Sequence, residues 1–247
     1  MLVVLLAARR LRSGDQGREP YVPAAMARVV VLDINETVSD LRGLIPRLEE
    51  VGVPGHLLQT FFASTLRDGF ALTAAGGYAD FAIVARGVLK SLLAGQGISA
   101  GRELDDAAAH VLAGMAELSL HEDVRPGLER LHRAGVRLVA LTNGSRETTV
   151  RLLERGGVGP YIERCFSVEE VRRWKPASEP YRMVAARCAV ALAEAMLVAV
   201  HPWDVDGAKR AGLSAAWINR EGAAYPAHLT EPDLICSGFD ALADALG

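Results

Sequence analysis

The sequence has little of the material from which disulfide scaffolds and thiolate metal sites are built. Its three cysteines, Cys165, Cys188 and Cys236, lie far apart in a chain of 247 residues. Their number and spacing exclude a disulfide framework and a paired-cysteine metal site. We interpret them as buried, inert thiols and expect a protein of the reducing cytoplasm.

Excess charge of either sign is also missing. The formal net charge is -3, with 23% charged and 50% hydrophobic residues. A nucleic-acid-binding protein usually carries a basic face, and a disordered chain is poor in apolar residues, so neither class is indicated. A chain of this length can bury a full hydrophobic core in one domain, or in a core domain with a smaller addition.

The chain has no apolar run long enough to span a membrane. The N-terminal run Met1–Ala8 is eight residues long, against the ~20 that a membrane helix needs. Arg9 and Arg10 follow this run, whereas a signal peptide carries its positive charge first. We interpret residues 1–25 as an appendage that contributes little to function; a short helix packed on the domain is the alternative. We expect no membrane partner.

Short apolar runs rich in β-branched residues do recur, and helix-length segments separate the later ones. The runs are Val29–Leu32, Val136–Leu141, Cys165–Val168, Met196–Val200, Ser214–Ile218 and Leu234–Cys236. The helical segments between them are residues 146–155, 179–194 and 204–212. This alternation predicts an α/β fold with a doubly wound, Rossmann-like parallel sheet.

The span between the first two of these runs has a different pattern. Apolar residues recur there at three- and four-residue spacing, in segments 43–51, 55–67, 78–94 and 103–117. This spacing is typical of amphipathic helices. We therefore predict an all-helical cap, residues 41–119, inserted into an α/β core that comprises residues 26–40 and 120–247.

Polar residues follow four of the predicted strands. They are Asp33, the pair Thr142 and Asn143, Lys175, and the segment from His201 to Asp204. Each one singly has an ordinary explanation as a turn residue, a helix cap or a solvated lysine. Because ligands of an open α/β sheet bind at the carboxyl ends of its strands, the set together favours an active site.

The same residues resemble a known superfamily. The order Asp33-x-x-x-Thr37, Thr142-Asn143-Gly144-Ser145, Lys175-Pro176 and Trp203-Asp204-x-x-Gly207-Ala208 is similar to that of the haloacid dehalogenase superfamily. The resemblance runs from about residue 27 to the C-terminus. It implies that Asp33 is a nucleophile that forms a covalent enzyme intermediate.

Two positions depart from the pattern of the phosphatases that make up most of this superfamily. Phosphatases need a carboxylate two residues after the nucleophile, and a further acidic ligand for magnesium after the fourth strand. Asn35 and Val200 occupy these positions here. An amide cannot protonate a leaving group and a valine offers no metal ligand, so both changes weigh against phosphoryl transfer and against a metal.

The resemblance extends to one branch that works without metal, the hydrolytic 2-haloacid dehalogenases. It is carried by the helical insertion after the first strand, by Tyr181 after Lys175-Pro176, and by Trp217-Ile218-Asn219-Arg220. The resemblance implies a cofactor-free hydrolase that acts on small 2-haloacids. Asp33 would displace halide, which needs no proton, and water would then hydrolyse the ester.

The resemblance also implies roles for the other residues. Lys175 would keep Asp33 ionised and oriented. Asp204 would pair with Lys175 or help to activate water. Candidates for binding carboxylate oxygens or positioning the nucleophile are Thr37, Thr142 and Asn143; candidates for lining the substrate site are Asn35, Tyr181 and Trp203.

Two departures from the dehalogenase pattern leave alternatives open. Dehalogenases receive the halide on a cap arginine, and the aligned position here is apolar, near Phe62. Arg67, one helical turn further on, is the candidate substitute; a surface salt bridge with Asp68 or Glu49 is the alternative. His201 replaces an asparagine, and it either polarises water or forms hydrogen bonds within its loop.

Two other functions stay open at this point. One is a magnesium-dependent phosphatase of the same superfamily that tolerates Asn35. The other is a catalytically weak member that binds a small acid or a partner protein through the cap. For the main hypothesis we expect a small-molecule substrate and no nucleic acid, and we leave a homodimer open.

Overall fold

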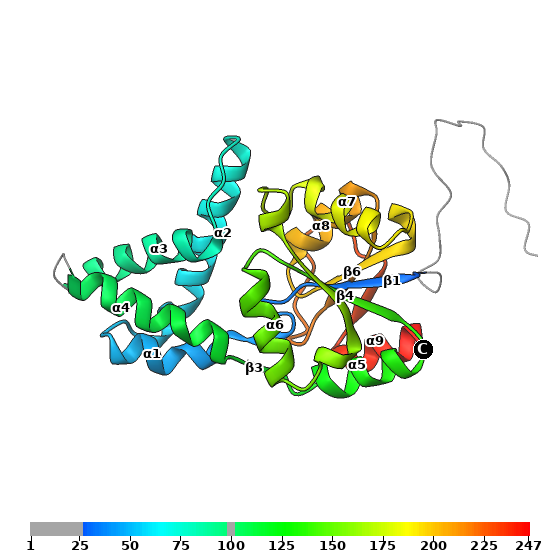
Figure 1. Ribbon diagram of the computed structural model, residues 1–247, viewed down its shortest axis with the longest axis horizontal. Coiled ribbons are helices and arrows are strands. Elements are labelled where there is room, and N and C mark those ends of the chain that lie inside the picture. The colour runs from blue at the N-terminus through cyan, green and yellow to red at the C-terminus, as the bar shows by residue number, and fades with distance from the viewer. Residues whose placement is uncertain (1–26, 98–101) are drawn as a thin grey trace, which may run out of the picture.

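The computed structural model of the chain describes residues 27–97 and 102–247; the predicted appendage, residues 1–25, lies outside them. Its main sheet has six strands in the order β5-β4-β1-β6-β7-β8, and every neighbouring pair is parallel (Figure 1). The strands are β1 (Val29–Leu32), β4 (Arg137–Thr142), β5 (Ile162–Ser167), β6 (Ala195–Ala199), β7 (Ser214–Ile218) and β8 (Leu234–Cys236).

Helices cover both faces of this sheet. On one face α5 (Val124–Arg133) packs against α9 (Phe239–Leu246), and on the other α7 (Ser178–Arg187) packs against α8 (Pro202–Ala211) (Figure 1). Helix α6 (Arg146–Arg155) follows β4. Alternate residues of each central strand enter different hydrophobic clusters, as the two-residue period of a strand requires. The predicted doubly wound α/β fold is confirmed.

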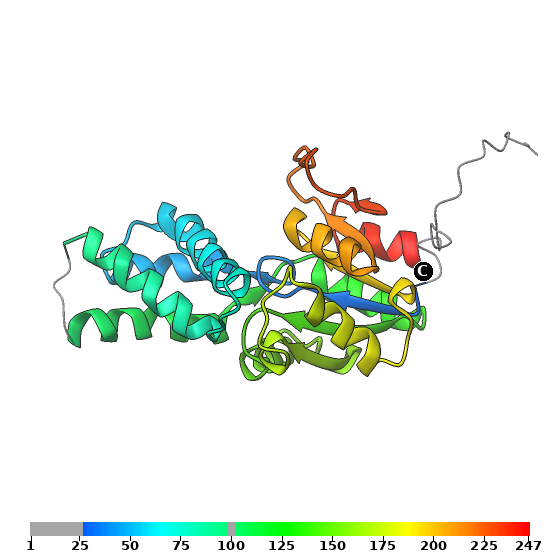
Figure 2. The ribbon, with the colours of Figure 1, turned by 90° about the horizontal axis from the view of Figure 1, so that it is seen from above.

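Four helices form a separate bundle beside the carboxyl ends of the strands (Figures 1 and 2). They are α1 (Ile45–Glu50), α2 (Leu58–Ala74), α3 (Phe81–Gly95) and α4 (Arg102–Ala113). Two segments connect the core to this bundle, and they pair as a short antiparallel ladder of β2 (Ser39–Asp40) with β3 (Ser119–Leu120). The predicted helical insertion after the first strand is confirmed, while its use as an independent domain, residues 41–119, stays a prediction.

Several predicted elements have other bounds in the structure, and for three of them the difference is large. The strand predicted from Cys165 begins at Ile162. Its first residues include polar, exposed ones because the strand lies at the sheet edge, so the apolar pattern does not reveal them. The helix predicted for 179–194 ends at Arg187, since the chain turns through the left-handed backbone of Ala189. Helix α2 runs on to Ala74, beyond the predicted residue 67. Gly69 is buried in the middle of this helix and does not end it.

The cysteines are free, and none of them forms a disulfide. Cys188 and Cys236 are buried and Cys165 is half-buried. Burial raises the pKa of the Cys165 thiol to about 12, so this group stays protonated and unreactive at neutral pH. Within residues 27–97 and 102–247, no helix combines the length and the apolar content that crossing a bilayer requires.

Trp174, in the loop after β5, fastens the helical cap to the core. Its side chain is fully buried, and its indole Nε1 donates to the carbonyl oxygen of Ala79 at 2.9 Å. Its ring stacks on Phe81 of α3, with 5.8 Å between ring centroids. Gly69 of α2 makes this contact possible, because a Cβ there would lie 2.3 Å from the Trp174 ring.

We expect Gly69→Ala to destabilise the protein by roughly 1–3 kcal/mol, because the added methyl overpacks against a buried ring. Gly87→Ala is the matched control. Gly87 also lies in a cap helix, with no atom within 4 Å of its Cβ position, so alanine there should be neutral or stabilise through helix propensity. Urea denaturation of both variants measures the difference; equal midpoints would contradict this assignment.

Candidate active site

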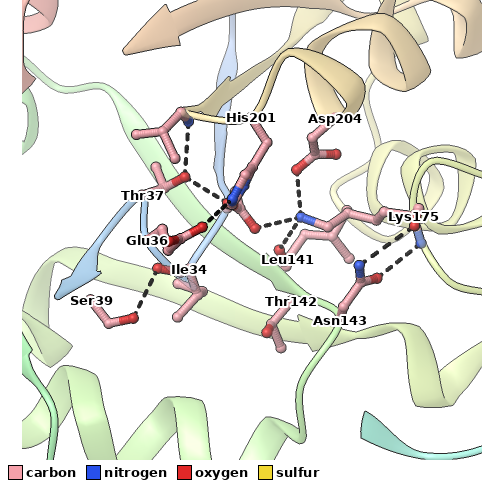
Figure 3. A network of polar contacts seen from close by, with 12 residues as sticks. Ile34, Glu36, Thr37, Ser39, Leu141, Thr142, Asn143, Lys175, His201 and Asp204 are labelled. Atoms are coloured by element: carbon pink, nitrogen blue, oxygen red, sulfur yellow. Dashed lines mark hydrogen bonds and ion pairs between the residues drawn. The ribbon is translucent and has the colours of Figure 1, made fainter. Parts of the chain in front are cut away.

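The polar residues predicted from the strand ends meet at one edge of the sheet (Figure 3). Strand β1 lies between β4 and β6, so Asp33, which follows β1, lies between the loops that carry Asn143 and His201. Lys175 comes from the loop after β5, and Asp204 from the first turn of α8. The parallel topology alone brings the ends of these strands together.

Lys175 is the centre of the cluster. Its side chain is fully buried, and its ammonium Nζ donates to Asp33 Oδ1 at 2.7 Å, to Asp204 Oδ2 at 2.6 Å and to the carbonyl oxygen of Leu141 at 3.1 Å. Burial lowers the pKa of Lys175, but the charges of Asp204 and Asp33 outweigh it and raise the net value. The ammonium therefore stays charged and fully bonded.

The loop after β4 holds the backbone of Lys175. Asn143 Oδ1 accepts from the Lys175 N–H at 2.9 Å, and its Nδ2 donates to the Lys175 carbonyl oxygen at 3.5 Å. Thr142 Oγ1 accepts from the N–H of Gly144 at 2.9 Å. Both side chains are buried beside the cluster. Their hydrogen bonds orient the lysine and shape the turn.

The second oxygen of Asp33 has two partners of its own. Thr37 Oγ1 donates to Oδ2 at 2.6 Å and accepts from the N–H of Val200 at 3.0 Å. His201 Nδ1 lies 3.2 Å from the same Oδ2. Burial works to raise the pKa of Asp33, but Lys175 and then His201 outweigh it and hold the pKa well below its ordinary value. Asp33 is thus a carboxylate at neutral pH.

His201 bridges two carboxylates. Its Nε2 lies 2.8 Å from Glu36 Oε2, so each ring nitrogen faces an acidic oxygen (Figure 3). Burial lowers the pKa of His201, but the hydrogen bonds to Asp33 and Glu36 outweigh it and raise the value to about 9. The side chain is therefore an imidazolium at neutral pH, and its bonds reach beyond its own loop.

Glu36 is a member of this cluster that the sequence interpretation missed. Its backbone has a φ of 62°, a left-handed conformation that is uncommon outside glycine. His121 Nε2 contacts its carbonyl oxygen at 2.9 Å, which supports this turn from outside. The sequence did contain a signal for Glu36, because it is a titratable residue in the loop of Asp33, one position before Thr37.

Asp204 and Tyr181 close the cluster on the side of α7 and α8. Both are fully buried, and the Tyr181 hydroxyl donates to Asp204 Oδ1 at 2.5 Å. Burial raises the pKa of Asp204 against the opposing charge of Lys175. Burial, followed by the charge of Asp204, also raises the pKa of Tyr181 well above its ordinary value, so the phenol stays a donor.

Aromatic residues from the cap helix α2 and from the core helix α8 pack around His201. Phe62 of α2 stacks on His201 with 6.1 Å between ring centroids, and Trp203 of α8 stacks on it at 5.0 Å. Phe70 contacts Trp203 edge-on at 4.8 Å. The predicted site residue Trp203 thus belongs to an apolar surface that packs on His201, which favours a small, partly apolar ligand.

Arg67 does not join the cluster. At 3.6 residues per turn it lies about 140° around α2 from Phe62, so it points away from the side that covers His201. Its side chain is 70% exposed, and its Nε donates to Asp68 Oδ1 at 2.8 Å. This geometry favours the alternative, a surface salt bridge with Asp68, over a role for Arg67 in binding substrate.

Asn35 and Val200 do not supply the ligands that magnesium needs. Asn35 is half-buried beside the loop after β4, where its Nδ2 lies 3.9 Å from the Cβ position of Gly144. Across the described ranges, no group of three or more His, Cys, Asp and Glu side chains could hold a metal ion. The ammonium of Lys175 lies where the two buried carboxylates converge. These residues do not fit a resident magnesium ion.

The raised pKa of His201 links stability to pH. The imidazolium is stabilised only in the folded protein, where the pKa is about 9 against an ordinary 6.5. Its contribution is complete below pH 6.5 and is lost as the pH rises through 9, so the free energy of unfolding should fall by roughly 1–3 kcal/mol over this window.

Urea denaturation at both ends of this window measures the fall, and His201→Gln should flatten it. His110→Gln is the matched control, because His110 pairs with Glu50 at 2.6 Å on the exposed surface of the cap. This control should keep the wild-type pH dependence. A fall of the same size in His201→Gln would contradict the expectation.

Known proteins are similar to this chain in sequence and in fold. A family model for haloacid dehalogenase-like hydrolases matches residues 27–212. The haloacetate dehalogenase H-2 of Moraxella sp. (strain B) is 34% identical over 120 residues, which are 49% of this chain and 54% of that enzyme. The match therefore spans about half of that relative's own length. The (S)-2-haloacid dehalogenase 4A of Burkholderia cepacia is 26% identical over 197 residues, 79% of this chain and 84% of that enzyme.

Solved structures of similar shape include the L-2-haloacid dehalogenase of Xanthobacter autotrophicus with chloropropionic acid covalently bound. It has a TM-score of 0.79 and 23% identity, and the match covers 89% of this chain and 98% of that one. At such identity the likeness shows the shared fold. The family match spans most of the chain and includes Asp33, Lys175 and Asp204. The chain belongs to the haloacid dehalogenase-like hydrolases.

Proposed function

We propose that the protein is a metal-independent hydrolase that removes halide from small 2-haloacids. The observation that carries the proposal is the buried Lys175 ammonium at 2.7 Å from Asp33 Oδ1, which keeps the carboxylate ionised and directed. Asn35 and Val200 leave the site without the acid and the ligand that a phosphatase uses. The dehalogenase relatives support the same reaction.

The first step is displacement at the substrate's α-carbon. An oxygen of Asp33 attacks this carbon, a C–O bond forms, and the carbon–halogen bond breaks as halide leaves with the electron pair. Chloride and bromide are weak bases and leave without a proton. Asp204 keeps Lys175 charged when Asp33 becomes a neutral ester, because its Oδ2 stays 2.6 Å from the ammonium.

The second step is hydrolysis of this ester. Water attacks Cγ of Asp33, and the bond between the carboxyl carbon and the alkyl oxygen breaks to release a 2-hydroxy acid. The hydroxyl of Thr37 and the ammonium of Lys175 both donate to the carboxyl group of Asp33. Donors fixed at these oxygens stabilise the negative charge that develops on the tetrahedral intermediate.

The remaining site residues position these groups or line the substrate space. Asn143 holds the backbone of Lys175, Thr142 shapes the turn after β4, and Tyr181 orients Asp204. Asn35, half-buried beside the loop after β4, and Trp203, which stacks on His201, are assigned to the lining of the substrate site. A cytoplasmic location and a homodimer stay predictions. The Mg-dependent phosphatase is disfavoured by the ligand set, and no contact in the described residues favours the weak binding protein.

We expect the purified protein to release chloride from 2-chloropropionate in buffer with EDTA. Asp33→Asn should abolish this release, because an amide is not a nucleophile for this displacement. Asp240→Asn, which changes a 58% exposed aspartate of α9, is the matched control and should keep wild-type activity. Phosphate release from a generic ester that depends on magnesium, without halide release in EDTA, would replace this function with the phosphatase.

We also expect Arg67→Ala to release halide within about twofold of the wild-type rate, as for other surface changes. The structure places this side chain on the exposed side of α2. Steady-state halide release at several substrate concentrations measures the effect. A rise in KM of tenfold or more would show that Arg67 reaches the substrate.

A further inference from the structure

Halide displacement needs no proton from the pair of Glu36 and His201, although His201 helps Lys175 to hold the pKa of Asp33 low. Chloride and bromide leave without a proton, and Lys175 already holds Asp33 ionised. The site nevertheless keeps an imidazole in contact with Asp33 Oδ2 at 3.2 Å and with Glu36 Oε2 at 2.8 Å. An imidazole held by a carboxylate at one nitrogen is the arrangement that serves as a proton acceptor at the other.

The position of His201 indicates which step it serves. In an in-line displacement the halide leaves from the side of the carbon opposite to the attacking oxygen. His201 contacts the carboxyl group of Asp33 itself, so it lies on the side of the nucleophile. Hydrolysis of the ester takes place at Cγ of Asp33, which is within reach of Nδ1 through one water molecule.

Asp204, the other candidate base, is already engaged. Its Oδ2 accepts from Lys175 and its Oδ1 from Tyr181, and its side chain is fully buried. His201 and Glu36 are 12% and 38% exposed in their side chains. This pair can therefore exchange a proton with solvent, which Asp204 cannot do as readily.

We propose that Glu36 and His201 form a catalytic dyad in which His201 Nδ1 is the general base for hydrolysis of the Asp33 ester. The proposal rests on the proposed function, because the ester forms only if Asp33 displaces a leaving group. Glu36 is the positioning residue: it accepts a hydrogen bond from the Nε2–H group of His201, which leaves Nδ1 as the nitrogen that can take up a proton.

The proton balance of the cycle closes with this assignment. In the resting state Asp33 is a carboxylate and His201 an imidazolium. Ester formation removes the charge of Asp33, so His201 loses its Nδ1 proton to solvent. Nδ1 then takes a proton from the attacking water and passes it to the departing alkoxide of the hydroxy acid. The new carboxyl group of Asp33 returns its proton to Nδ1, which restores the resting state.

The groups around His201 are consistent with such a cycle. Asp33 and Glu36 are the acidic groups in contact with it, and Lys175 and Asp204 lie behind Asp33. His121, at the Glu36 carbonyl, has its pKa lowered by burial and by Arg220. Phe62 from α2 and Trp203 from α8 carry no charge. Loss of the Asp33 charge is therefore the main electrostatic change at the ring during turnover.

Rapid mixing with 2-chloropropionate separates the two steps. In His201→Gln we expect a chloride burst of one equivalent per site at the wild-type rate, followed by turnover slowed about 10²–10⁴-fold, the usual contribution of a general base. Intact-mass spectrometry should then show the ester on Asp33. His110→Gln, at the exposed cap pair with Glu50, should turn over as wild type does.

The outcomes of this experiment distinguish failure of the dyad from failure of the proposed function. A slower burst without accumulation of the ester would overturn the dyad and leave His201 with a role in displacement or in holding Asp33. Unchanged turnover in His201→Gln would overturn it as well. If the wild-type protein releases no chloride at all, the proposed function fails, and the dyad fails with it.

The pH dependence of ester hydrolysis tests Glu36 separately. Hydrolysis should rise with pH as His201 becomes neutral. Glu36→Gln removes the negative charge that favours the imidazolium, so the rising limb should move to lower pH while the chloride burst keeps its rate. Glu50→Gln, at the exposed cap pair, is the control. A limb at the same pH in Glu36→Gln would show that Glu36 has only a structural role and would overturn the dyad.

Discussion

The structure of the site depends on one buried cation. Lys175 is fully buried, and its ammonium is the shared partner of Asp33, Asp204 and the Leu141 carbonyl. A charge taken out of water is tolerated only when it is paired and hydrogen-bonded. Without this ammonium, two carboxylates would face each other in a region of low polarity, and at least one would take up a proton. Asp33 is therefore ionised because the lysine is in place.

That requirement explains the surroundings of the cluster. Asn143 bonds to both backbone polar groups of Lys175, and Trp174, the preceding residue, lies between the cap helices α2 and α3. The segment that delivers the ammonium is thus fixed by the core on one side and by the cap on the other. The cap contributes shape and an apolar surface to the site, and the charges come from the core.

The interpretation of the sequence succeeded in predicting which polar residues lie together in the structure. Polar residues after apolar runs located Asp33, Asn143, Lys175 and Asp204, because the carboxyl ends of parallel strands share one edge of the sheet. It also selected Arg67, which lies in a surface ion pair with Asp68, because a shift of five residues along a helix changes the face. It missed Glu36, whose left-handed backbone turns the side chain toward His201.

By itself the sequence determined the α/β fold, the helical insertion and the set of groups available for chemistry, including the replacement of two metal-site residues by Asn35 and Val200. Periodicity and order carry this information because strands and helices repeat their faces at fixed intervals. Only the tertiary structure decided that Phe62 covers the site, that Arg67 faces solvent and that His201 joins Glu36 to Asp33. Those contacts link segments far apart in the chain, and their geometry comes from packing, which no local pattern encodes.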